Sequence, residues 1–221
     1  MPEPNRPGGV LVTDFDGTLT RRDFYRLVID ELLPPGTPDF WAEYLAGRIT
    51  HFEAIRRTFA AAPAGEAALV GLARKMGLEP DLKGEVERLR REGWRVVVAS
   101  AGCLWYIQML LDEAGVVLEV HANPGHIEGD RLAMTWPVDS PYFSPETGID
   151  KAAVVREALG AGGPVAFAGD GPPDLGPALL VPPRLRFARG YLAHALTKRR
   201  EPFRPFDRWA EVARMVVEES G

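Results

Sequence analysis

Two aspartates one residue apart, Asp14 and Asp16, directly follow an apolar run that begins at Val10. Such a run predicts a buried parallel strand, and because side chains alternate along a strand, we expect both carboxylates to project on the same side at its end. Ligands of open α/β sheets bind in the crevice beyond the carboxyl ends of the strands. Two carboxylates in that position are costly unless they hold a metal or carry out chemistry, so the pair predicts a functional site.

Polar clusters also follow two other predicted strands, at the point where each apolar run ends. They comprise Ser100, Ala101 and Gly102 after residues 95–99, and Asp170 and Asp174 after residues 164–168. Taken singly, each cluster is explained by turns and helix caps, which Asp and Ser favour. Three clusters at the carboxyl ends of parallel strands are much harder to explain as turns, so we expect them to form one site.

The aspartates are typical ligands of a hard cation. Mg²⁺ prefers few carboxylates, with water and substrate phosphate oxygens completing an octahedral arrangement. The histidines have no zinc-ligand spacing, so structural or surface roles are expected for His51, His121, His126 and His194. Mg²⁺ is therefore the predicted cofactor, and a carboxyl group that the metal does not bind is the more natural proton carrier.

Lys151 and Ser100 are candidate phosphate ligands. Lys151 follows the predicted helix cap Asp150, in a first turn where the helix dipole disfavours a cation, and a bound anion would offset that cost. An exposed lysine at a tolerant position is the alternative. Ser100 either caps the following helix or, together with the amides of Ala101 and Gly102, holds a phosphate at the helix N-terminus.

The elements that must position these residues alternate between strand and helix after residue 93. This alternation predicts an α/β fold with a doubly wound parallel sheet. No strand-like segment occurs between residues 20 and 93, where four helices are predicted before a fifth returns to the sheet. We therefore predict a core of residues 1–20 and 80–221 with a small helical cap, residues 21–79, inserted after the first strand in the position of a lid.

The downstream half contains three weaker patterns. Residues 116–121 and 131–136 alternate around two glycines, which suggests a hairpin or an edge pair. Residues 185–188 predict a last short strand. Residues 207–219 predict a C-terminal helix with one apolar face.

Composition limits the class of protein. The 221 residues are 46% hydrophobic and 26% charged, which is ordinary for a soluble globular enzyme. A net charge of −5 argues against a nucleic-acid binder, and the single cysteine, Cys103, is compatible with a reducing compartment. The polar, Pro-rich residues 1–9 lack the apolar core of a signal peptide and are expected to form a frayed tail. No apolar run approaches the roughly 20 residues that span a bilayer, so we expect a cytoplasmic protein without a membrane partner.

Four motifs in this order resemble the signature motifs of the haloacid dehalogenase superfamily. They are residues 14–20 (DFDGTLT), residues 100–102 (SAG), Lys151 and residues 169–174 (GDGPPD). The resemblance implies that Asp14 is the nucleophile that forms an aspartyl-phosphate, and that Asp16 acts first as general acid and then as general base. It implies that the metal is held by Asp14, Asp170 and the backbone carbonyl of Asp16.

The same resemblance assigns the remaining polar residues. Ser100 and Lys151 would bind the phosphate, and Asp174 would support the metal shell. An acid at Asp16 assists an alkoxide leaving group, whereas a halide needs no proton. The second aspartate therefore favours a phosphatase, with a small-molecule phosphate ester as its partner, over a dehalogenase.

Within the superfamily, the helical insertion resembles the cap of the phosphoserine phosphatase-like branch. Residues 135–137 (TWP), 187–192 (FARGYL) and 205–206 (PF) resemble the enol-phosphate phosphatases of methionine salvage. Phosphoserine phosphatase-like, phosphocholine or phosphoethanolamine phosphatase, phosphomutase and non-catalytic phosphate-binding functions are the alternatives. Candidates for contacting the leaving group, none of them assigned, are Arg21, Arg22, Tyr25, Trp41, Arg48, Arg56 and Arg57.

Overall fold

The computed structural model describes residues 8–219, so residues 1–7 of the expected N-terminal tail lie outside the described part. A six-stranded sheet forms its centre, with the strand order β10-β9-β8-β1-β2-β3 and parallel pairing throughout. The strands are β1 (Gly9–Thr13), β2 (Trp94–Cys103), β3 (Glu119–Asn123), β8 (Val165–Gly169), β9 (Arg186–Ala188) and β10 (Arg204–Pro205). The predicted α/β fold with a parallel sheet is confirmed.

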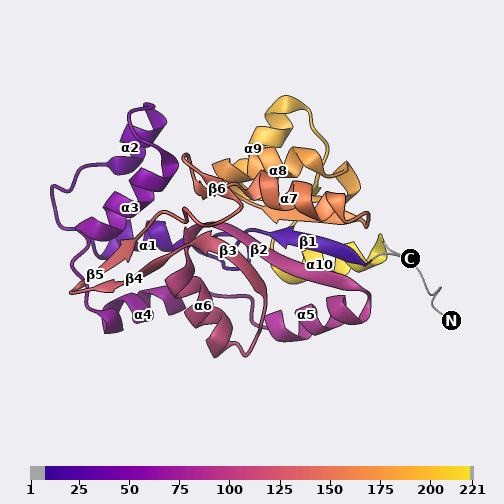
Figure 1. The fold of residues 1–221 in the computed structure, drawn as a ribbon, viewed down its shortest axis with the longest axis horizontal. Coiled ribbons are helices and arrows are strands. Elements are labelled where there is room, and N and C mark those ends of the chain that lie inside the picture. Colours follow the sequence, from indigo (N-terminus) through magenta and orange to yellow (C-terminus); the bar gives the residue numbers. More distant parts are fainter. Residues whose placement is uncertain (1–7, 220–221) are drawn as a thin grey trace.

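Helices cover both faces of this sheet (Figure 1). One face carries α7 (Lys151–Gly160), α8 (Leu175–Leu180) and α9 (Gly190–Arg199), and the other carries α5 (Leu82–Arg91), α6 (Leu104–Glu113) and α10 (Trp209–Glu218). Strand β1 therefore has to be apolar on both sides: Val10 and Val12 belong to one hydrophobic core and Leu11 to the other. No helix within residues 8–219 is both long and apolar enough to cross a membrane.

Four helices lie between β1 and α5, as predicted. They are α1 (Phe24–Glu31), α2 (Phe40–Leu45), α3 (His51–Ala61) and α4 (Glu66–Arg74). This segment lies beyond the carboxyl end of β1, at the left of Figure 1. Its entry and exit are joined by an antiparallel bridge between Thr20 and Leu78, and the Glu79 amide donates to the Leu19 carbonyl at 2.9 Å. The division into a core and a cap of residues 21–79 stays a prediction.

The predicted pairing of residues 116–121 with residues 131–136 is wrong. β3 instead joins the main sheet beside β2, and the hairpin consists of β4 (Gly125–Glu128) and β5 (Arg131–Met134). An edge strand with one exposed side has the same alternating pattern as a hairpin strand, so the pattern did not distinguish them. A further pair, β6 (Phe143–Ser144) with β7 (Gly148–Ile149), has strands too short to leave a periodic pattern.

Candidate active site

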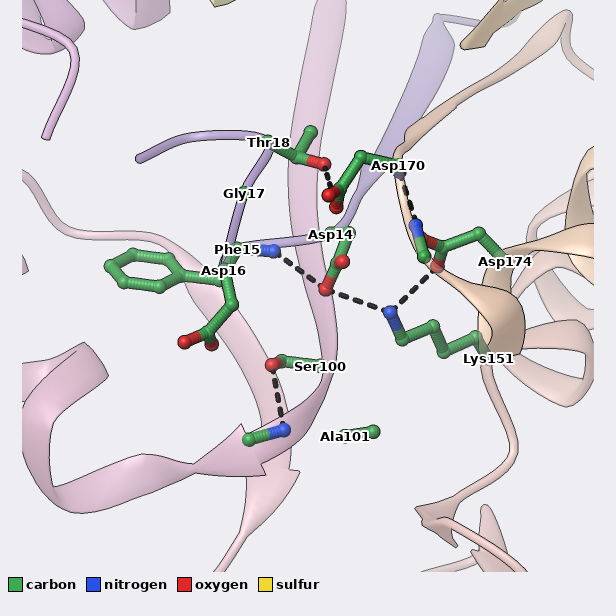
Figure 2. A network of polar contacts seen from close by, with 12 residues as sticks. Asp14, Phe15, Asp16, Gly17, Thr18, Ser100, Ala101, Lys151, Asp170 and Asp174 are labelled. Atoms are coloured by element: carbon green, nitrogen blue, oxygen red, sulfur yellow. Dashed lines mark hydrogen bonds and ion pairs between the residues drawn. The ribbon is translucent and has the colours of Figure 1, made fainter. Parts of the chain in front are cut away.

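The order of the sheet brings the predicted site residues together. β1 lies between β8 and β2, so Asp14, Asp170 and Ser100 come from three adjacent strands. The Asp14 amide continues the ladder and donates to the Ala168 carbonyl at 2.9 Å. Figure 2 shows Asp14 at the centre of this group, with Lys151 and Asp174 on one side. The expectation that the three strand-end clusters meet is therefore correct.

Asp14 is held by a buried ion network. Its Oδ1 atom accepts a hydrogen bond from the Phe15 amide at 2.7 Å and lies 2.7 Å from Lys151 Nζ. Lys151 Nζ also lies 2.6 Å from Asp174 Oδ1, and the Lys151 side chain is 3% exposed. The alternative of an exposed lysine is thus wrong: Lys151 begins α7 behind the cap Asp150 and is directed at the nucleophile candidate.

Both carboxylate oxygens of Asp174 accept hydrogen bonds. Its Oδ1 atom accepts from Lys151, and its Oδ2 atom accepts from the amides of Asp170 at 3.0 Å and Gly171 at 2.8 Å. Asp170 is less constrained, because among residues 8–219 its carboxylate accepts a single hydrogen bond, from Thr18 Oγ1 to Oδ1 at 3.1 Å. This difference fits Asp170 as a direct metal ligand and Asp174 as the residue that orients it.

The donor set fits a hard divalent cation. Asp14, Asp170 and Asp174 each offer a carboxylate oxygen, and these oxygens lie within 4.8 Å of one another. Burial raises the pKa of Asp14 well above its usual range, and the charge of Asp174 raises it further, although Lys151 opposes the shift. Burial and Asp174 likewise raise the pKa of Asp170 to about 7. One lysine does not balance the negative charge of three carboxylates this close together. A bound cation would supply the missing positive charge.

Asp16 has a separate environment from Asp14. Its Oδ1 atom accepts a hydrogen bond from the Phe24 amide at 3.0 Å, and its Oδ2 atom accepts one from the Tyr106 hydroxyl at 2.9 Å. The Cys103 amide in turn donates to the Tyr106 oxygen at 3.1 Å. Burial, followed by the charge of Asp23, raises the pKa of Asp16 to about 8. Its carboxyl group therefore carries a proton at neutral pH, as a general acid requires.

The helix after this strand begins at Leu104, as its sequence predicts, but the expectation that Ser100 lies at the helix N-terminus is wrong. β2 continues through Ser100 to Cys103, with a shifted register against β3 after Ala99, and α6 begins only at Leu104. Ser100 is 1% exposed, and its Oγ atom accepts a hydrogen bond from the Gly102 amide at 3.0 Å. Ser100, Ala101 and Gly102 all line the cavity that contains Asp14, so their binding of phosphate stays a proposal.

Gly102 is predicted to be essential for the placement of Asp16. A Cβ atom at this position would overlap the Tyr106 hydroxyl and lie 2.7 Å from Asp16 Oδ2. We expect Gly102→Ala to lower phosphate release at least about tenfold and to lower the melting temperature, because overpacking costs about 1–3 kcal/mol. Gly71→Ala is the matched control, since a Cβ atom there meets nothing within 4 Å and helix α4 gains a better helix former. Equal activity of both variants would contradict this role.

Sequence reasoning missed most of the cap-side lining of the cavity. The cap contributes Asp23, Tyr25, Trp41, His51, Ile55 and Phe59. Tyr25 and Trp41 were candidates, whereas His51 was expected to be structural or at the surface. Within the described residues, none of the candidate arginines lines this cavity. The local sequence signal for these residues was the apolar face of α3. An apolar face by itself does not show that it borders the site.

The loop after β1 is supported by a residue far along the chain. Arg189 donates from Nε to the Gly17 carbonyl at 2.5 Å and from a terminal nitrogen to the Thr20 carbonyl at 2.7 Å. Gly17 has a φ of +67°, and a Cβ atom there would overlap the Asp170 carboxylate. The loop therefore approaches Asp170 closely only because residue 17 is glycine.

Curated proteins resemble this chain at low identity. A 2-hydroxy-3-keto-5-methylthiopentenyl-1-phosphate phosphatase from Brevibacillus brevis is 22% identical over 211 residues, covering 94% of each chain. A protein of the same name from Geobacillus kaustophilus is 26% identical over 131 residues, covering 58% of this chain and 59% of that protein.

Solved structures share the fold and extend the comparison. A HAD family hydrolase from Salmonella enterica serovar Typhi has a TM-score of 0.67 at 17% identity, covering 93% of this chain and 70% of that one. A substrate-bound phosphoserine phosphatase has a TM-score of 0.64 at 14% identity, covering 98% of this chain and 99% of that one. The family model described as haloacid dehalogenase-like hydrolase matches residues 11–178, from β1 into α8. The chain therefore belongs to the haloacid dehalogenase-like hydrolase family.

Proposed function

We propose that this protein is a Mg²⁺-dependent phosphomonoester hydrolase that acts on a small metabolite through an aspartyl-phosphate on Asp14. The observation that carries the proposal is the buried network in which Lys151 lies 2.7 Å from Asp14 and 2.6 Å from Asp174, next to Asp170. Membership of the hydrolase family and the names of the curated relatives support the same reaction.

The residues of the chain divide the reaction between them. An Asp14 oxygen attacks phosphorus while the bond from phosphorus to the ester oxygen breaks, and Asp16 gives its proton to that oxygen. Water then attacks the phosphorus of the aspartyl-phosphate, and Asp16 takes the proton of the water, which restores Asp14 as a carboxylate. Lys151 and Ser100 hold the phosphate in line. Asp14, Asp170 and the Asp16 carbonyl would hold Mg²⁺, which would supply positive charge that stabilises the phosphoryl oxygens.

For the organic part of the substrate, we propose an enol phosphate of the kind named for the two curated relatives. The motifs that resemble that subgroup lie in the second half of the chain, and Arg189 of the 187–192 segment reaches the loop after β1. Phosphoserine, phosphocholine and phosphoethanolamine are the competing substrates, because structures named phosphoserine phosphatase share this fold.

A phosphate-release screen tests both levels of the proposal. The purified protein is assayed with Mg²⁺ or EDTA against the enol phosphate, phosphoserine, phosphocholine, phosphoethanolamine and sugar phosphates. We expect Mg²⁺-dependent release with the enol phosphate preferred. Another preferred ester would overturn the substrate and leave the reaction intact, whereas no release from any ester would overturn the reaction. In ¹⁸O-labelled water, a hydrolase places the label in the released phosphate, and transfer to a second substrate without label would indicate a phosphomutase.

Mg²⁺ is predicted to stabilise the protein in a pH-dependent manner. The folded-state pKa values of Asp14 and Asp170 lie above the value of about 3.9 that an unfolded Asp has, so the metal-free protein loses stability as the pH rises from about 4 through 7. A cation bound to the ionised carboxylates opposes this loss. At 100 times its dissociation constant it adds about 2.7 kcal/mol, or roughly 5–10 °C in melting temperature.

Thermal melts with Mg²⁺ or EDTA at pH 5.5 and pH 8 measure this effect. We expect a larger Mg²⁺ shift at pH 8 in the wild type and little shift at either pH in Asp170→Asn. Asp139→Asn is the matched control, because Asp139 is exposed and lies outside the cavity. A full shift in Asp170→Asn would remove Asp170 from the metal site.

A further inference from the structure

His51 lies on the cap side of the active-site cavity in a fixed position. It is the first residue of α3 and is 5% exposed. Its backbone amide donates to Glu146 Oε1 at 3.3 Å, and its ring packs edge-on against Trp41 at 5.7 Å and Tyr44 at 5.4 Å. The imidazole is therefore held by packing on two sides at the wall of the cavity.

Not every polar atom of the His51 ring makes a hydrogen bond. Within the described residues, His51 Nδ1 is buried and has no hydrogen-bond partner. Burial lowers the pKa of His51 to about 4, and the charge of Lys151 adds to this shift, so the imidazole is neutral at physiological pH. A buried polar group without a partner costs about 1–3 kcal/mol, and a neutral imidazole offers one donor and one acceptor to a ligand. The ring is thus suited to bind an uncharged polar group.

The remaining lining disfavours a leaving group that carries a carboxylate. Ile55, Phe59 and Trp41 provide apolar and aromatic surface, and Lys151 is the only cationic side chain among the described lining residues. Lys151 already contacts two aspartates. Asp16 and Asp23 also face the cavity and neither is a cation, so a carboxylate on the leaving group would lose its hydration there without a cation to pair with.

The same lining fits a quaternary ammonium group poorly. The aromatic rings of Tyr25 and Trp41 already face a cation, because the Arg26 guanidinium lies 5.8 Å and 5.7 Å from their centroids. A quaternary ammonium group has no hydrogen-bonding atom for His51, so the imidazole would stay unpaired in the complex. A hydroxyl or carbonyl group satisfies it.

We propose that His51 binds the leaving group by a hydrogen bond, and that the cavity selects phosphate esters whose leaving group is uncharged and combines a hydroxyl or carbonyl group with an apolar remainder. This inference rests on the proposed phosphatase function and specifies its substrate class. Ile55, Phe59 and Trp41 would contact the apolar remainder.

The test compares variants of His51 on esters that differ in one property of the leaving group. The esters are an uncharged hydroxyketone enol phosphate, phosphoserine, phosphocholine and phenyl phosphate, whose leaving group offers no group beyond the ester oxygen. His51→Phe keeps an aromatic ring and removes the hydrogen bond, whereas His51→Gln keeps a donor and an acceptor. His126→Phe, at an exposed position on β4, is the matched control.

We expect the wild type to prefer the hydroxyketone ester over phosphoserine and phosphocholine. His51→Phe should lower kcat/KM for the hydroxyketone ester about 10- to 100-fold and change kcat/KM for phenyl phosphate less than threefold. Only the hydroxyketone ester loses a hydrogen bond in this variant. His51→Gln should recover part of the loss, and His126→Phe should match the wild type. Unchanged melting temperatures would establish that the variants fold.

Each contrary result has a distinct meaning. An equal loss on both esters in His51→Phe would show that the residue only shapes the site, and no loss would show that it binds nothing; either overturns the role of His51. A wild-type preference for phosphoserine or phosphocholine would overturn the substrate class while the phosphatase function stands. Failure of the wild type to hydrolyse any of the four esters would overturn the phosphatase function and this inference together.

Discussion

Asp14→Asn is expected to lower the rate of phosphate release at least about 10⁴-fold, because it removes the atom that attacks phosphorus. An amide cannot form the acyl-phosphate bond, and loss of a covalent nucleophile is among the largest single effects known in hydrolases. The substitution also removes one of two carboxylates that contact Lys151, while Asp174 still pairs with the lysine at 2.6 Å. Steady-state phosphate release and trapping of phosphorylated protein by rapid acid quench measure the two consequences.

The fold should survive this change. Burial raises the pKa of Asp14 and so opposes its ionised form, and asparagine has nearly the same shape. We expect a melting temperature close to that of the wild type in EDTA and loss of most of the Mg²⁺ shift. Asp139→Asn, an exposed counterpart, should retain full activity. Retained turnover or retained phosphoenzyme in Asp14→Asn would exclude Asp14 as the nucleophile.

Asp16→Asn is expected to have an effect that depends on the leaving group. Loss of a positioned acid should slow formation of the aspartyl-phosphate about 10²- to 10⁴-fold for alkyl esters, whose alkoxide needs a proton. The effect should be much smaller for phenyl phosphate, because phenolate leaves more readily. Loss of the base slows the second step for every ester, so phosphorylated enzyme should accumulate with phenyl phosphate in this variant.

The pH dependence adds a second measurement for Asp16. Its pKa is raised to about 8 by burial and by Asp23, so the proton required for leaving-group departure is present below that pH and lost above it. The rate of phosphoenzyme formation from an alkyl ester should therefore decline above about pH 8 in the wild type, and this decline should be absent in Asp16→Asn. Rapid-quench rates between pH 6 and pH 9.5 provide the comparison. A uniform loss on alkyl and aryl esters, with the pH profile unchanged, would assign Asp16 a structural role only.

The sequence was informative about the residues close to strand ends. Asp14, Ser100 and Asp170 could be placed at one site because a parallel strand is recognisable from its apolar run, and adjacent parallel strands end at the same edge of a sheet. The helices before β2 were recognisable for a similar reason, since their apolar faces repeat every three to four residues. These are local patterns, and each is complete within about ten residues.

The hairpin and the end of β2 were not determined locally. The alternation of apolar and polar residues in 116–121 is compatible with an edge strand and with a hairpin strand. Which of the two forms depends on whether β2 is available as a neighbour. Ser100 follows an apolar run as a helix cap would, yet pairing with β3 resumes at Cys103 and keeps the segment extended. In both cases a contact with another strand decided between two conformations that the local sequence allows.

The sequence by itself determined which chemical groups this protein carries and at which edge of the sheet they meet. Only the tertiary structure decided their environments: Tyr106 donates to Asp16 across 90 residues, Asp174 accepts from Lys151 across 23, and the cap places His51 at the same cavity. The reason is physical. Residue types and short periodicities are encoded locally, whereas burial, pairing and the pKa values that follow from them depend on groups that only the folded chain brings together.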